Sequence, residues 1–201
     1  KRTEKGFSLL KDGGIEVVEK ELLSSKICQC FDVKQVIYNR SVFAEEPVTI
    51  SENITSKDFS IVSMEAFEIY SQNHDRNIRK YILSLDKHDY YMMNIVDYLV
   101  GNTDRHWGNW GVLVNNANNK PVSLHPLMDF NKTFNSYDGI EGSNCQTCFG
   151  KKVNQKEAAL YAVGKIGLNQ IKEVNYEWFE YFPEYVGMFK KRLEILNGLK
   201  D

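Results

Sequence analysis

Residues 101–111 read GNTDRHWGNWG and concentrate one Asp, one Arg, one His, two Asn, two Trp and three Gly in a single connection. The preceding segment, HDYYMMNIVDYLV (88–100), has the apolar pattern of a buried helix, and Gly101 suits its C-terminal cap. The following segments, WGVLVNN (110–116) and KPVSLHPL (120–127), predict a β-hairpin with a polar turn. The sequence thus predicts a polar loop held between a buried helix and a hairpin.

Two carboxylates and an amide are spaced in this region as phosphoryl transfer requires. Asp104 and Asn109 lie five residues apart, and Asp129 follows Asn109 by twenty residues, directly after the second hairpin strand. The reaction needs one carboxylate to orient or accept the proton of the attacking hydroxyl, and an amide oxygen with a second carboxylate to hold Mg²⁺. Because the loop and the second strand meet at one end of the hairpin, we expect the three side chains to converge. The protein-kinase pattern H-R-D-x-x-x-x-N followed by D-F-G has the same Asp-to-Asn interval.

A lysine on a strand and a glutamate on the next helix are the further parts that such a site needs. Lys11 ends the strand pattern FSLLK (7–11), and the helical pattern IEVVEKELLSSKICQCF (15–31) follows. The Lys ammonium group neutralises phosphate charge, and the Glu holds its rotamer. The candidate partners on the helix are Glu21, which we favour, and Glu19 and Glu16, because a register taken from sequence is easily wrong by one turn.

The order of the predicted elements indicates an α+β chain with two lobes. A partial N-lobe with strands and one Glu-bearing helix, residues 1–54, precedes a mainly helical C-lobe, residues 55–201, with the polar loop and the hairpin. We make no assignment for residues 55–80. Further strands are expected at 33–43 and 45–51, and further helices at 155–167, 168–174 and 183–198.

The composition argues against several function classes. With 201 residues, 42% of them hydrophobic and 26% charged, the chain has a globular composition. The net charge of −2 and the lack of a Lys/Arg-rich block argue against a nucleic-acid interface. The longest apolar run, MMNIVDYLV, is too short and too interrupted for a membrane span, and no signal sequence opens the chain.

Four cysteines occur as Cys28, Cys30, Cys145 and Cys148. Two such pairs could in principle supply a four-thiolate zinc site, because C-x-x-C is a common half of one. Cys28 and Cys30, however, fall late in a predicted helix, where alternate residues point in diverging directions. We therefore favour reduced thiols in a cytoplasmic protein and keep a zinc-stabilised structural protein as an alternative.

The segment NTDRHWGNWGVL (102–113), followed by HPLMDFN (125–131), resembles the catalytic core of the HipA-like serine/threonine kinases. These bacterial enzymes are related in fold to protein kinases and phosphatidylinositol kinases, and the resemblance implies a bilobed protein kinase-like fold. The family pattern is an N-x-D-x-H-x-x-N loop and a later Asp in an L-x-P-x-Y-D context. The segment EKELLSSKI also resembles the Glu-bearing helix, and the resemblance runs from about Phe7 to the final helix. The matching residues are Asn102, Asp104, His106, Asn109, Pro126 and Asp129.

The resemblance implies a role for each candidate residue in transferring the γ-phosphoryl group of ATP to a protein Ser or Thr hydroxyl. It implies ATP and Mg²⁺ as cofactors, a protein substrate and an antitoxin-like partner. His106 is expected to brace the loop, and residues 47–53 to form the hinge beside adenine. Asp104 would be the catalytic base, Asn109 and Asp129 the Mg²⁺ ligands, Lys11 the contact to the α- and β-phosphates, and Glu21 the partner of Lys11.

The chain departs from the family pattern at two points. Met128 stands where the family has Tyr, and only six residues precede the strand that ends at Lys11. Because the chain also begins with Lys1 rather than Met, we expect the first strands and the phosphate-covering loop to be missing. Two alternatives follow: a catalytically degenerate kinase fold that acts as a binding module, or a kinase for a lipid or small molecule. The lack of a basic membrane-facing run disfavours the lipid.

Overall fold

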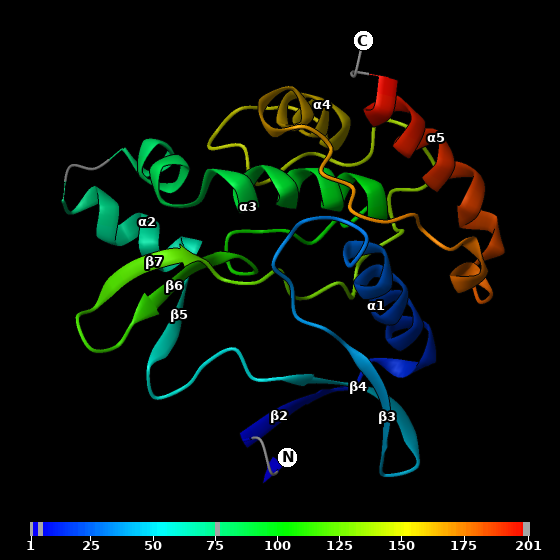
Figure 1. Cartoon of the computed structure of the whole chain (residues 1–201), viewed down its shortest axis with the longest axis horizontal. Helices are drawn as coiled ribbons and strands as arrows, with labels where there is room; N and C mark the ends of the chain where they lie inside the picture. The colour runs from blue at the N-terminus through cyan, green and yellow to red at the C-terminus, as the bar shows by residue number, and fades with distance from the viewer. Residues whose placement is uncertain (1, 4–5, 75–76, 199–201) are drawn as a thin grey trace.

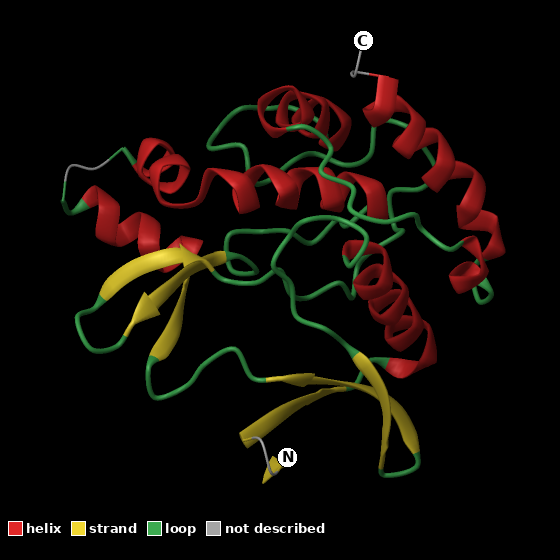
Figure 2. Cartoon of the chain, viewed as in Figure 1, coloured by secondary structure: helices red, strands yellow, loops and turns green. Residues whose placement is uncertain are grey.

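The computed structural model describes residues 2–3, 6–74 and 77–198, and it arranges them as two small antiparallel sheets on one side of a layer of helices (Figure 1). Strands and helices are segregated in space, which is the α+β architecture predicted from the sequence (Figure 2). The elements, in chain order, are β1 (Arg2–Thr3), β2 (Gly6–Lys11), α1 (Gly14–Cys28), β3 (Asn39–Phe43), β4 (Glu46–Glu52), β5 (Phe59–Ser63), α2 (Met64–Gln72), α3 (Ile78–Val100), β6 (Gly111–Asn115), β7 (Lys120–Leu124), α4 (Gln155–Ile166), η1 (Tyr176–Phe179), η2 (Pro183–Tyr185) and α5 (Val186–Asn197).

The first sheet has the strand order β1-β2-β4-β3, and every neighbouring pair is antiparallel. The strands expected from FSLLK and EEPVTIS are confirmed as β2 and β4. Lys11 lies opposite Thr49 in the register, which places it at the end of β2 nearest the start of α1. Helix α1 packs against β4 and covers one face of the sheet.

The strand expected over 33–43 is shorter than predicted, because only Asn39–Phe43 pairs within the sheet. The residues before it run beside the end of the β6–β7 hairpin. Val36 N donates to Leu127 O (2.8 Å), and Leu127 N donates to Lys34 O (2.9 Å). Val36 and Tyr38 are buried in the core there, so contacts with a segment distant in sequence replace the sheet ladder.

Helix α3 is the centre of the helical layer, and every residue from Asp89 to Val100 is buried. The predicted helix over 88–100 is confirmed and begins earlier, at Ile78. A kink at Asp86 divides it, and the Asp86 carboxylate accepts from Asp89 N (3.2 Å) and from Leu124 N in β7 (3.1 Å). Asp86 thereby caps the second half of α3 and joins it to the hairpin. None of the described helices is long and apolar enough to cross a membrane.

Glycines set both ends of the loop 101–111. Gly101 ends α3 in the left-handed conformation (φ 60°, ψ 41°), as predicted, and a Cβ there would lie 2.7 Å from the Tyr137 ring. Gly111 begins β6, where a Cβ would lie 2.1 Å from the carbonyl oxygen of Val62 in β5. The predicted hairpin is confirmed, and β5 adds a third strand to it in the order β5-β6-β7.

The C-terminal helices cover α3 on the side away from the sheets. Helices α4 and α5 confirm the predictions for 155–167 and 183–198, although the latter opens with the short η2. The helix predicted over 168–174 is wrong. Asn169 takes a left-handed conformation (φ 51°), and Ile171 N donates to Cys30 O (2.8 Å) at the end of α1. Bonds to the residues just after α1 thus replace the helical i to i−4 bonds of this segment.

Candidate functional site

Three of the predicted residues meet between the first sheet and the hairpin. Lys11, on β2, donates to Glu21 Oε1 on α1 (2.9 Å) and also contacts Asp129 Oδ1, 118 residues away in the sequence. Glu21 is 1% exposed, and its second oxygen accepts from Thr49 Oγ1 on β4 (2.6 Å). Sheet, helix and the segment after β7 therefore share one charged cluster.

The electrostatics of this cluster keep Lys11 charged. Burial disfavours the ammonium ion, but the Glu21 and Asp129 carboxylates outweigh this effect and raise the pKa of Lys11 above its usual value. The rival glutamates have other partners: Glu16 pairs with Lys20 (2.8 Å), and Glu19 pairs with Arg40. Of the three candidates, Glu21 is the one that the register of α1 directs at Lys11.

Side chain-to-backbone bonds give the loop 101–111 its shape. Asp104 N donates to Asn102 Oδ1 (3.0 Å), and Asn109 Nδ2 donates to Asp104 O (2.8 Å). Both Asp104 and Asn109 remain half-buried. The Asp104 carboxylate and the Asn109 amide oxygen take no part in these two bonds, so both are available to a ligand.

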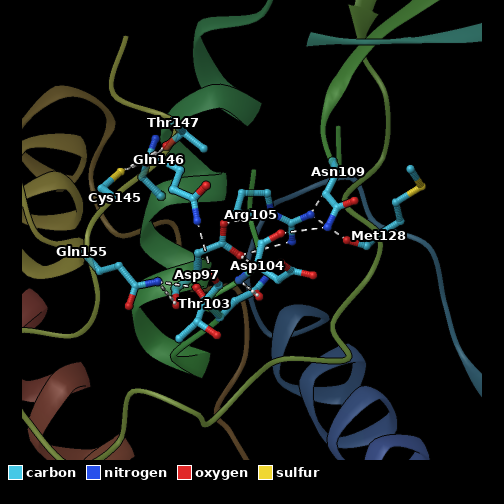
Figure 3. Close-up of polar contacts among 12 residues, drawn as sticks. Asp97, Thr103, Asp104, Arg105, Asn109, Met128, Cys145, Gln146, Thr147 and Gln155 are labelled. Atoms are coloured by element: carbon cyan, nitrogen blue, oxygen red, sulfur yellow. Dashed lines mark hydrogen bonds and ion pairs between the residues drawn. The ribbon is translucent and has the colours of Figure 1, made fainter. Parts of the chain in front are cut away.

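Arg105 is the main structural residue of the site that sequence reasoning missed. Its guanidinium is buried and pairs with Asp97 on α3 through Nε (2.9 Å) and Nη2 (3.2 Å). Nη1 donates to the carbonyl oxygens of Asn109 (3.0 Å) and Met128 (2.6 Å). Figure 3 shows the guanidinium between α3, the loop and the segment that leads to Asp129. One side chain thus sets the spacing of Asn109 and Asp129.

Asp129 has a left-handed backbone (φ 61°), which is unusual for a residue other than Gly and which Asp tolerates better than most. Its backbone N–H donates to the Tyr38 hydroxyl (3.1 Å), and burial raises the pKa of Tyr38, so this hydroxyl stays neutral. Tyr38 was also missed, because it lies in the segment predicted to be a strand. The strained backbone at Asp129 is typical of a functional position.

His106 was expected to brace the loop, and Met128 stands where the HipA-like pattern has Tyr. His106 is exposed, and its Nδ1 accepts from Gly108 N (3.0 Å), a bond confined to the loop. Met128 contributes its carbonyl oxygen, which accepts from Arg105, and its half-buried side chain packs on the core. The contact with Arg105 is made by the backbone of Met128 and so does not depend on which side chain stands at this position.

A cleft of about 700 Å³ opens between the first sheet and the hairpin region. One wall comes from the first sheet, including Ser51 and Glu52 on β4, and continues into Asn53. The other comes from the hairpin region, with Leu113 and Pro126. The segment predicted to form a hinge, 47–53, therefore borders this cleft through its last four residues, Ile50 to Asn53.

The donor set fits Mg²⁺ better than zinc. Asp129 offers a carboxylate and Asn109 an amide oxygen, and hard oxygen ligands of this kind suit Mg²⁺, which keeps several waters and binds phosphates as well. Within residues 2–3, 6–74 and 77–198, no group of three or more His, Cys, Asp or Glu could hold a metal ion. Cys28 ends α1 and Cys145 and Cys148 lie in the loop before α4, and none of these thiols belongs to such a group in that part of the chain.

His125 makes the stability of this region dependent on pH. Burial lowers the pKa of His125, whose Nδ1 bonds to Pro126 O (2.8 Å). The unfolded chain therefore binds a proton at a pH where the folded chain does not, so stability is complete above the ordinary His pKa of about 6.5 and declines below it. We expect urea unfolding between pH 7 and pH 5 to show a steeper loss in the wild type than in His125→Asn. Equal slopes would contradict this assignment.

A small sheet with one helix, a cleft, and a helical region that carries the loop 101–111 together make a protein kinase-like fold. The crystal structure of a Helicobacter pylori proinflammatory kinase, CtkA, has a similar fold. It superposes on this chain with a TM-score of 0.69. The two are 15% identical, and the match covers 94% of this chain and 85% of that one. At this identity the likeness shows the fold. No protein-family model and no curated protein matches the chain.

Proposed function

We propose that the chain is a HipA-like kinase that transfers the γ-phosphoryl group of ATP to a Ser or Thr hydroxyl of a protein, with Mg²⁺. The observation that carries the proposal is the cluster of Lys11, Glu21 and Asp129 beside the loop with Asp104 and Asn109. These five residues come from four separate segments and lie together in a kinase-like fold. They follow one another along the chain in the order that the corresponding residues have in protein kinases.

The cleft between the first sheet and the hairpin region is the proposed site of ATP. Its volume of about 700 Å³ lies within the range of ordinary ligand pockets. Adenine would lie against the β4 end at Ser51–Asn53, with the phosphates directed at Lys11. Lys11 supplies the positive charge, and Glu21, fixed by Thr49, holds the ammonium group in place when the phosphates compete with Asp129 for it.

Phosphoryl transfer depends on side chains that the fold already holds in position. Mg²⁺, when bound, neutralises charge on the phosphates, and Asn109 Oδ1 and the Asp129 carboxylate would hold it. Arg105 fixes the distance between these two ligands through the carbonyl oxygens of Asn109 and Met128. Asp104 orients the attacking hydroxyl and accepts its proton. Catalysis by this set rests on positioning and charge neutralisation.

Nucleotide binding tests the proposal directly. We expect calorimetry to detect binding of ATP with Mg²⁺ to the wild-type chain, and Asp129→Asn to weaken it by at least about tenfold, or about 1.4 kcal/mol, because a Mg²⁺ ligand loses its charge. Asp138→Asn is the matched control, since it makes the same change at an exposed Asp in another segment, and it should bind as the wild type does. No binding to the wild type would leave a kinase fold that serves as a binding module.

The acceptor is tested separately. Transfer of labelled phosphate from ATP to Ser or Thr of protein substrates is the expected result. Labelling confined to phosphatidylinositol vesicles or to small alcohols would instead assign a lipid or small-molecule kinase. Each acceptor should be tested with Asp104→Asn in parallel, so that contaminating kinases are recognised by activity that persists in the variant.

A further inference from the structure

Cys145 and Cys148 form a thiol pair that the proposed phosphoryl transfer does not use. They lie in the loop before α4 with their Sγ atoms 3.0 Å apart, and both side chains are half-buried. A disulfide needs about 2.05 Å, so a movement of about 1 Å would allow the bond to form. Figure 3 shows Cys145 on the segment whose next residue, Gln146, reaches Thr103 of the candidate catalytic loop.

The two thiols differ in acidity. A hydrogen bond from Cys148 lowers the pKa of Cys145 to about 7 and raises the pKa of Cys148. Thr147 Oγ1 lies 3.2 Å from Cys145 Sγ and adds to this effect. Because the thiolate is the form that attacks disulfides, Cys145 is the nucleophile of the pair at neutral pH, with Cys148 beside it to resolve the product.

A small pocket of about 70 Å³ opens next to the pair, and Cys148 lines it. Arg79 and Lys151 are the basic residues in its wall and Glu157 is the acidic one, with Tyr91 and Tyr161 also in the lining. Arg79 and Cys148 line the same pocket, and the positive charge of Arg79 acts to lower the pKa of the Cys148 thiol, against the larger effects that raise it. With two cations and one carboxylate the wall keeps an excess of positive charge, which favours an anionic reagent such as a disulfide that carries carboxylates.

The loop between the two cysteines contacts the candidate catalytic loop on both sides of Asp104. Trp107 Nε1 donates to Gln146 O (2.8 Å), and Gln146 Nε2 donates to Thr103 O (3.4 Å). Thr147 O accepts from Tyr90 OH on α3 (2.9 Å). A disulfide would close a small ring around Gln146 and Thr147, so these bonds must adjust when it forms.

We propose that Cys145 and Cys148 are a redox-active dithiol site that takes a small anionic disulfide of the glutathione class, and that the Cys145–Cys148 disulfide alters the loop around Asp104. The site and its coupling to the loop are independent of the proposed kinase activity. Both are therefore tested by readouts other than phosphoryl transfer.

The reaction is a thiol–disulfide exchange in two steps. The Cys145 thiolate attacks one sulfur of the small disulfide, the S–S bond breaks, and its electron pair leaves on the other half as a thiolate, which takes the Cys148 proton. The Cys148 thiolate then attacks Cys145 Sγ and expels the second half, which takes a proton from water. The protein dithiol is oxidised by two electrons, and one disulfide becomes two thiols.

Mass spectrometry after equilibration with reduced and oxidised glutathione, followed by alkylation in denaturant, tests the site. We expect the free thiols to fall from four to two, with a peptide cross-link between Cys145 and Cys148. Buried Cys28 and Cys30 are the internal control and should stay reduced. Cys148→Ser should stop at a mixed disulfide of Cys145 with glutathione. Absence of the cross-link at every glutathione ratio would overturn the proposal.

Two further measurements test the pocket and the coupling. Lys151→Gln should slow oxidation by glutathione disulfide severalfold but leave oxidation by neutral hydroxyethyl disulfide unchanged. If the variant and the wild type are oxidised at the same rate by glutathione disulfide, the role of the pocket is overturned. In a Trp178→Phe background the remaining tryptophans, Trp107 and Trp110, both lie in the loop 101–111. Oxidation should shift their combined emission, and Cys145→Ser should remove the shift. A cross-link without a shift would overturn the coupling to the loop.

Discussion

Asp104→Asn is expected to bind ATP and Mg²⁺ as the wild type does and to transfer phosphoryl groups about 10²- to 10⁴-fold more slowly, the range for loss of a general base. Asn has the size of Asp and keeps the bonds of the Asp104 backbone to Asn102 and Asn109. It cannot accept the hydroxyl proton. The expectation rests on the proposed function.

The measurement combines calorimetry with a rate assay that uses labelled ATP and a protein substrate. Asp138→Asn is again the control for the chemical change, and it should retain the full rate. A rate in Asp104→Asn equal to that of the wild type would show that another group takes the proton. Loss of nucleotide binding in the same variant would show that Asp104 belongs to the binding site instead.

Arg105→Met is expected to lower the free energy of unfolding by about 3–5 kcal/mol, because it leaves Asp97 as an uncompensated buried charge. It also removes the donor to the carbonyl oxygens of Asn109 and Met128. We therefore expect weaker binding of ATP with Mg²⁺ at temperatures where the variant is still folded. Urea unfolding followed by circular dichroism measures the stability, and calorimetry measures the binding.

Two variants give this prediction its controls. Lys156→Met breaks a more exposed ion pair with Glu141 (2.9 Å) and should cost about 1 kcal/mol or less. Asp97→Asn combined with Arg105→Met should be less destabilising than the sum of the single variants, since each single change leaves the other charge unpaired. Strictly additive effects would contradict a direct ion pair between Arg105 and Asp97.

Local patterns predicted most of the elements, and the errors share one cause. The buried helix that ends at Gly101 and the hairpin after it were recognised because apolar periodicity and glycine conformation are local properties. The segments 33–38 and 168–174 were assigned wrongly because their backbones bond to distant parts of the chain. Residue propensity carries no information about such partners.

The sequence by itself determined the α+β class, the loop 101–111 and the chemical identity of the candidate residues. The tertiary structure decided that Lys11 meets Glu21 rather than Glu16 or Glu19, and that Asp129 joins them across 118 residues. It also revealed the roles of Arg105 and Tyr38. The reason is physical: periodicity and turn chemistry act between neighbours in the chain, whereas the pairing of charges depends on how packed elements bury them together.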